Sequence, residues 1–106
     1  MSFRVSTLPR AEADVRAIAR YVRERSPRGA DAWLTAFEQA IHHLEQFADG
    51  CGEAAENGQF EIEVRQALFK TRRGRVYRLL FTIVDDEVRI LRVRGPGQAS
   101  VDSEEV

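Results

Sequence analysis

The fold is decided by the sequence VYRLLFTIV at residues 76–84, which is followed by the polar residues DDE at 85–87 and by VRILRVR at 88–94. In the first of these runs Tyr77, Leu79, Phe81 and Ile83 fall at alternate positions and share one face of a strand. Two such runs joined by a short polar segment predict an antiparallel hairpin. The glycines and proline at 95–97 end the second strand.

Two amphipathic helices are predicted upstream of this hairpin. Apolar residues recur at steps of three and four from about Pro9 to Arg25, which predicts the first helix. Ser26 and Pro27 suit the cap and first position of a second helix, which ends near Gly50. Their short connection favours an antiparallel helical hairpin.

The remaining segments complete an α+β fold. Alternation predicts a short strand at residues 3–7 and another at 62–71, and the polar residues 49–59 are expected to form a surface loop. The predicted order is β-α-α-β-β-β, with the helical hairpin packed on one face of a small antiparallel sheet. The expected organisation is a single domain over residues 1–98 and an acidic tail over 99–106.

Length and composition limit the classes of function. A chain of 106 residues suits one small domain, and no apolar run is long enough to cross a membrane. We see no signal peptide, and the single cysteine, Cys51, excludes an internal disulfide. A reducing cytoplasm is therefore the expected location. Neither a cofactor nor a metal site is expected.

Positive charge is concentrated in residues 65–94, where Lys70 and eight arginines stand against three carboxylates, a net charge of +6 in a chain whose total is −1. Alternation places Arg78 on the sheet face away from the helices, and Arg92 and Arg94 share a face with each other. If that face is also the open one, their guanidinium groups converge on a surface suited to phosphates or carboxylates. The alternative is a solvated face whose long side chains shield apolar atoms. The predicted target-binding residues are Arg78, Arg92 and Arg94, with Arg65 and Lys70 as weaker members.

Groups that transfer protons near neutral pH are scarce in this basic region. It contains no histidine, and Lys70 and Tyr77 are the only titratable candidates besides the remote acidic turn. His42 and His43 are neighbours on the second helix and diverge too far to bind one metal together. The region therefore favours anion binding over catalysis.

The pattern resembles the RelE/ParE superfamily, the toxins of type II toxin–antitoxin systems, and specifically the ParE-like branch. The matching features are the early strand before Pro9, the helical hairpin with Ala30-x-x-Trp33 and Ala40-Ile41-x-x-Leu44, and the two strand motifs at 76–83 and 88–94. The resemblance covers about residues 3–98. It implies a small bacterial toxin that a cognate antitoxin neutralises.

The resemblance leaves three functions open. ParE-type members inhibit DNA gyrase, whereas RelE-type members cleave messenger RNA on the ribosome, and a degenerate member would bind its antitoxin without being toxic. In a nuclease, Arg78 would stabilise charge and Lys70 or Tyr77 would move protons. The chain lacks the Tyr or His that the nuclease branch carries near its C-terminus, which favours gyrase as the target. An antitoxin helix is expected in a groove of the helical hairpin, contacting Ala19, Val22, Phe37 and Ile41, although these residues also suit the core.

Overall fold

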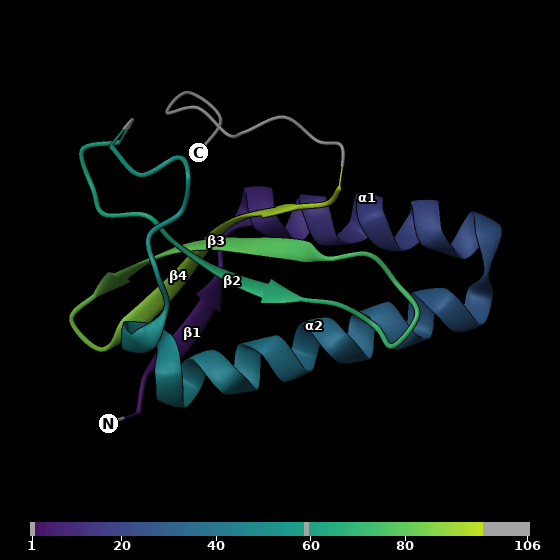
Figure 1. Ribbon diagram of the computed structural model, residues 1–106, viewed down its shortest axis with the longest axis horizontal. Helices are drawn as coiled ribbons and strands as arrows, with labels where there is room; N and C mark the ends of the chain where they lie inside the picture. The colour runs from purple at the N-terminus through teal and green to yellow at the C-terminus, as the bar shows by residue number, and fades with distance from the viewer. Residues whose placement is uncertain (1, 59, 97–106) are drawn as a thin grey trace.

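The computed structural model describes residues 2–58 and 60–96, so the predicted acidic tail lies outside the described residues. The elements are β1 (Arg4–Thr7), α1 (Pro9–Arg25), α2 (Pro27–Phe47), the 3₁₀ turn η1 (Ala48–Gly50), β2 (Arg65–Phe69), β3 (Tyr77–Val84) and β4 (Glu87–Arg94). The predicted order β-α-α-β-β-β is confirmed. The two helices lie together on one side of the sheet (Figure 1).

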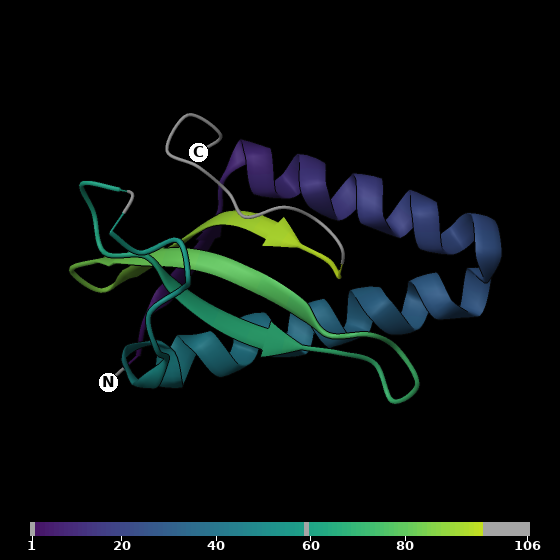
Figure 2. The ribbon, with the colours of Figure 1, turned by 45° about the horizontal axis from the view of Figure 1, so that its top comes forward.

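The junction between the helices follows its local sequence. Ser26 leaves α1 in an extended conformation, and its hydroxyl accepts a hydrogen bond from the Gly29 amide at 2.9 Å. Pro27 occupies the first turn of α2, where no intrahelical partner for its nitrogen is needed. This cap and proline produce the sharp reversal between the two helices that Figure 2 shows.

The sheet has the order β1-β4-β3-β2, and it is mixed where an antiparallel sheet was expected. β2, β3 and β4 form the predicted antiparallel meander, but β1 pairs with β4 in parallel. The reason is the path of the chain. The helical hairpin returns the chain to the end of the sheet where β1 began, so β2 runs in the direction of β1. The two further reversals leave β4 in that same direction.

One end of the β1–β4 pair is fixed by polar contacts. Glu87, at the start of β4, accepts hydrogen bonds from Arg89 Nε at 2.6 Å and from the Ser6 hydroxyl at 2.8 Å. These two donors lower the pKa of Glu87 below its usual 4.5, because they stabilise the carboxylate. The parallel pairing therefore places a charged group of β4 against the first strand.

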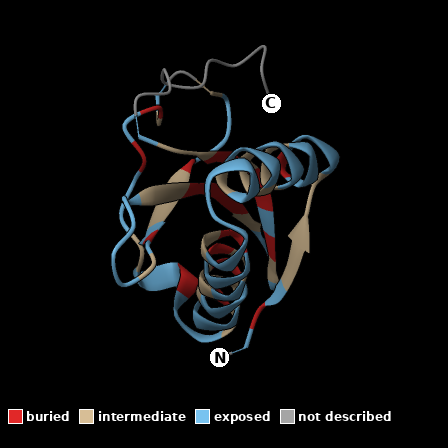
Figure 3. Ribbon diagram, turned by 90° about the vertical axis from the view of Figure 1, so that its right-hand side faces the viewer, coloured by how far each residue is buried: buried red, intermediate tan, exposed pale blue. Residues whose placement is uncertain are grey.

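Apolar side chains form the main core between the sheet and the helices. Alternate residues of β3 and β4, such as Phe81 and Ile90, pack there against Trp33, Phe37 and Leu44 of α2. Figure 3 shows the buried positions on the facing sides of the two layers. Trp33 and Phe37 are stacked with ring centroids 5.9 Å apart. Burial of these large rings stabilises the packing of the helices on the sheet.

A second, smaller core lies on the other face of the sheet, where the sequence predicted only a surface loop. Leu80 and Leu91 are buried there against Ala54 and Val64. The described residues of the segment 51–64, which we call the cap loop, supply this cover. Its ends are tied by hydrogen bonds from the Ala54 amide to the Val64 carbonyl at 2.9 Å and from the Gln66 amide to the Gly52 carbonyl at 3.1 Å. The sheet face away from the helices is thus partly covered.

Candidate functional site

The strand register brings three of the predicted arginines to the sheet face away from the helices. Arg78 pairs directly with Arg94, and Leu80 pairs with Arg92. Directly opposite residues of antiparallel strands share a face, and Leu80 belongs to the core under the cap loop. Arg78, Arg92 and Arg94 therefore begin from the same face, as alternation predicts.

Arg78 is neutralised by a carboxylate of the cap loop. Its two terminal nitrogens donate to the two oxygens of Glu56 at 2.9 and 2.8 Å, and Gln66 accepts a further hydrogen bond at 3.2 Å. The Glu56 side chain is fully buried, whereas 24% of the Arg78 side chain is exposed. The hydrogen bonds to Glu56 raise the pKa of Arg78 above its usual value, so the guanidinium stays charged. This arginine is part of a buried ion pair rather than an open anion site.

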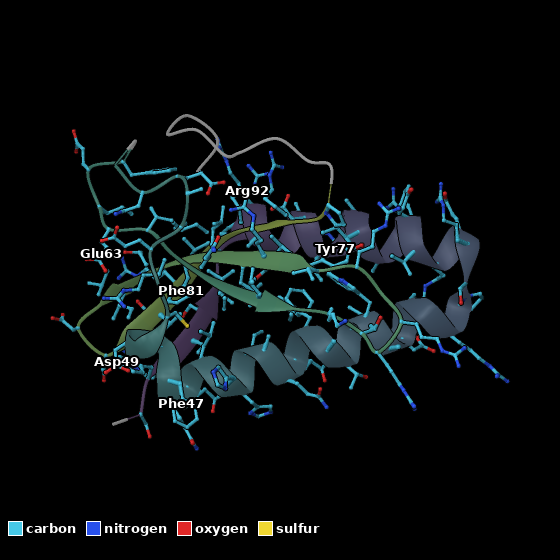
Figure 4. The ribbon with its side chains drawn as sticks, viewed as in Figure 1. Phe47, Asp49, Glu63, Tyr77, Phe81 and Arg92 are labelled. Carbon is cyan, nitrogen blue, oxygen red and sulfur yellow. The ribbon has the colours of Figure 1, made fainter. Side chains whose placement is uncertain are left out.

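Arg92 is neutralised by α1. Its Nε and Nη2 atoms donate to the two oxygens of Asp14 at 2.7 and 2.9 Å, and both side chains are 14% exposed. Asp14 also accepts a hydrogen bond from the Val93 amide at 2.9 Å. Leu8, which directly follows β1, donates a backbone hydrogen bond to the Ile90 carbonyl of β4. Further along β4, the Asp14 side chain accepts the hydrogen bond of the Val93 amide in place of a neighbouring strand. Arg92 lies beside α1 (Figure 4).

Arg65 lies on the opposite face from these arginines. It pairs with Phe81 across β2 and β3, so its side chain begins from the helix side of the sheet. Its Nη1 donates to the carbonyls of Asp49 and Cys51 at 3.0 and 2.8 Å, and its Nε pairs with Glu63 at 2.7 Å. Arg65 thereby holds η1 and the start of the cap loop to β2, and the structure does not bring it together with Arg78.

Lys70 is exposed and follows directly after β2. It begins the connection to β3, a short loop in which Arg72, Arg73 and Arg75 are also exposed. These four side chains form no ion pair within residues 2–58 and 60–96. The exposed positive charge of the region is therefore found at this loop, and we call Lys70, Arg72, Arg73 and Arg75 the cationic tip.

Tyr77 faces the helices, as alternation predicts. Its ring meets Trp33 edge-on with centroids 5.4 Å apart and lies 5.8 Å from the ring of Phe69. Burial raises the pKa of Tyr77 above its usual 10.0, which keeps its hydroxyl protonated near neutral pH. Arg78 points to the other face. The three residues named for a nuclease, Arg78, Lys70 and Tyr77, thus do not share one face.

The residues predicted to bind an antitoxin lie at or near the main core. Phe37 is buried, and Ala19 and Ile41 are half-buried against the core. Val22 is half-buried and lines a small cavity between the helical hairpin and the cationic tip. Antitoxin binding at these positions stays a prediction, and Val22 borders this cavity.

Other candidate chemistry receives little support from the described residues. Within residues 2–58 and 60–96, no group of three or more His, Cys, Asp or Glu side chains is placed to hold a metal ion. Burial raises the pKa of the Cys51 thiol above its usual 9.0, as expected for an unreactive cysteine. No helix in the described ranges is both long and apolar enough to cross a membrane.

Sequence reasoning missed the two carboxylates that define this face. Glu56 and Arg78 are 22 residues apart, and Asp14 and Arg92 are 78 residues apart. Glu56 lies in a polar segment that carries no strand or helix period, so no local signal marked it as buried. Only the folding of the cap loop over the sheet brings it to Arg78.

Comparisons with known proteins agree on the fold. The family model described as "ParE toxin of type II toxin-antitoxin system, parDE" matches residues 5–99. No curated protein gives a significant match. One similar solved structure is a chain of the chromosomal ParDE system from P. aeruginosa, with a TM-score of 0.68 and 23% identity over 89% of this chain and 96% of that one.

A second similar structure is a chain of the RelBE2 toxin–antitoxin complex from Mycobacterium tuberculosis. Its TM-score is 0.50, with 27% identity over 90% of this chain and 99% of that one. The family match spans nearly the whole chain and includes both helices, β2, β3 and β4, and all of β1 except Arg4. The chain therefore belongs to the ParE toxins of type II toxin–antitoxin systems.

Proposed function

We propose that the protein is a toxin that inhibits DNA gyrase by binding and that a cognate antitoxin neutralises it. Membership of the ParE toxins supports a toxin of a toxin–antitoxin system, and both similar structures come from systems that pair a toxin with an antitoxin. Gyrase as the target comes from the resemblance to the ParE branch.

The observation that carries inhibition by binding is the state of the arginines on the sheet. Arg78 and Arg92 are each held by a carboxylate in a bidentate pair, so neither is free to stabilise a scissile phosphate. Both histidines of the chain lie exposed on α2, away from this face. Cleavage of RNA requires a base and an acid near the charge stabiliser. The described part of this sheet face provides neither a base nor an acid placed beside a free arginine.

A ribonuclease of the RelE type is the second candidate, and the likeness to the RelBE2 structure favours it. It requires the Glu56 carboxylate to leave Arg78 and a proton carrier to reach the same face. A degenerate toxin that only binds its antitoxin is the third candidate.

The test uses the purified toxin in two reactions run side by side. In the first, relaxed plasmid and gyrase are titrated with toxin, and supercoiling is read on a gel. In the second, a translating ribosome extract receives the same toxin, and primer extension reports cleavage of the transcript. We expect supercoiling to fall as the toxin approaches the gyrase concentration, with transcripts intact. Cleaved transcripts with normal supercoiling would establish the ribonuclease instead, and no effect in either reaction would support the degenerate toxin.

A further inference from the structure

The cationic tip carries four positive side chains within six residues of sequence. Thr71 and Gly74 close its turn through a hydrogen bond from the Gly74 amide to the Thr71 carbonyl at 3.2 Å. A β-carbon at position 74 would collide with the Thr71 hydroxyl, so glycine suits this turn. Arg72 and Arg73 occupy the two corners. Figure 2 shows the loop projecting past the end of the sheet.

The cationic tip differs from six other arginines of the protein, which are each paired with a carboxylate. Arg4, Arg23, Arg65, Arg78, Arg89 and Arg92 each lie within 3.6 Å of a carboxylate oxygen. No carboxylate of the described residues reaches the cationic tip. A cluster of uncompensated charge on a projecting loop produces a strong local positive potential even in a chain with a net charge of −1.

The positive surface continues from the tip onto α1. Arg75 lines a cavity of about 570 Å³ together with Tyr21, Arg25 and Tyr77. The guanidinium of Arg25 lies 3.6 Å from the centre of the Tyr21 ring, and Tyr21 is 56% exposed. Arg25 thereby adds a fifth cation beside the four of the tip.

From these observations we propose that the cationic tip docks on the phosphate backbone of double-stranded DNA. The inference rests on the proposed function, since the toxin would contact DNA held by gyrase in addition to the enzyme. Guanidinium forks match phosphate oxygens.

Exposure of the cationic tip favours DNA over an acidic peptide. Exposed ion pairs with single carboxylates contribute at most about 1 kcal/mol each, because water screens them. DNA binds exposed cations by releasing condensed counterions, and this release does not require burial. Two arginine–carboxylate pairs of this protein, Arg78 with Glu56 and Arg92 with Asp14, are largely shielded from water. The cationic tip has no such shielding.

The binding test uses the full chain and a fluorescently labelled 30-base-pair DNA duplex, with anisotropy measured across a salt series. Four phosphate contacts predict a slope of log affinity against log salt of about −3.6. The double substitution Arg72→Gln and Arg73→Gln removes two phosphate contacts. It is expected to make the slope shallower by about 1.8 and to weaken the affinity at 0.1 M salt by a factor on the order of tens. Circular dichroism verifies that this variant is folded.

The matched control is the double substitution Arg16→Gln and Arg20→Gln on the exposed side of α1. It removes the same charge from two exposed arginines that have no ion pair in the described structure. We expect its salt slope to match that of the unchanged protein. Equal losses in both variants would overturn the proposal, because general charge would then account for binding. Tighter binding of polyglutamate than of the duplex would overturn it in favour of an acidic peptide.

Failure of this inference is distinguishable from failure of the proposed function. DNA binding is measured without gyrase, and the supercoiling titration is repeated with the Arg72 and Arg73 variant. Full inhibition of supercoiling by that variant, with no duplex binding by the unchanged protein, would refute the role of the tip and leave gyrase inhibition standing. Duplex binding by a protein that does not affect supercoiling would refute the proposed function and leave the DNA site standing.

Discussion

Removal of the Arg78 side chain is expected to destabilise the protein because it takes the guanidinium away from a buried carboxylate. Glu56 is fully buried, and both of its carboxylate oxygens bind Arg78 at 2.8–2.9 Å. Breaking such a pair from one side costs about 3–5 kcal/mol of the free energy of unfolding. In a domain of this size, 1 kcal/mol lowers Tm by about 4 °C or more, so Arg78→Ala is expected to lower Tm by at least about 12 °C.

Substitution of the partner residue, Glu56, is expected to lower the free energy of unfolding less than Arg78→Ala does. Glu56→Gln removes the buried charge and keeps a hydrogen-bond acceptor, while Arg78 keeps its bond to Gln66 and its access to water. We expect it to lower the free energy of unfolding by about 1–2 kcal/mol. The double variant Arg78→Ala with Glu56→Gln removes both charges of the ion pair. It is therefore expected to be about 2 kcal/mol more stable than Arg78→Ala alone.

The pH dependence gives an independent check on the same reasoning. Without Arg78, burial raises the pKa of the Glu56 carboxyl above its unfolded value, so the folded state binds the proton more tightly. The stability of Arg78→Ala then falls as the pH rises from the unfolded pKa to the raised folded pKa. Urea denaturation followed by circular dichroism between pH 5 and pH 8 measures this. The double variant lacks the carboxyl and is expected to show no such loss.

A double variant no more stable than Arg78→Ala, together with equal stability at pH 5 and pH 8, would refute this account of the ion pair. The result also governs how toxicity is interpreted. Loss of toxicity in Arg78→Ala reports unfolding as much as function. Only loss of toxicity in the stabilised double variant would assign Arg78 to the contact with the target.

Three further outcomes follow from single contacts. Asp14→Ala is expected to lower the free energy of unfolding, measured by urea denaturation, by about 2–4 kcal/mol, because it breaks the shielded pair with Arg92 and leaves the Val93 amide without its acceptor. The control Asp31→Ala removes an exposed carboxylate and is expected to change that free energy by at most about 0.5 kcal/mol. Similar losses in both variants would contradict this. The lowered pKa of Glu87 means that its contribution to stability is complete above pH 4.5 and is lost as the pH falls through the lower folded value, so Glu87→Gln is expected to flatten that part of the stability profile, and an unchanged acid profile would argue against it. Because burial raises the pKa of Cys51, iodoacetamide at pH 8 is expected to alkylate the folded protein more slowly than the urea-unfolded protein, and equal rates would disprove this.

The local sequence determined the elements of this protein. The period of the apolar residues predicts both helices and the β3–β4 hairpin, and Ser26 with Pro27 predicts the reversal between the helices. Alternation predicts that Tyr77 and Arg78 face opposite sides of the sheet, as the register confirms. These features depend on neighbours within a few residues, so the sequence alone contains them.

The tertiary structure decided how the charges are paired. The parallel pairing of β1 with β4 and the folding of the cap loop over the sheet join segments that are far apart in the chain. They bring Glu56 to Arg78 and Asp14 to Arg92, which changes two expected anion-binding arginines into shielded ion pairs and leaves the cationic tip exposed. The sequence determines which residues carry a charge. Its partner depends on a contact across tens of residues, and only the packed chain fixes that contact.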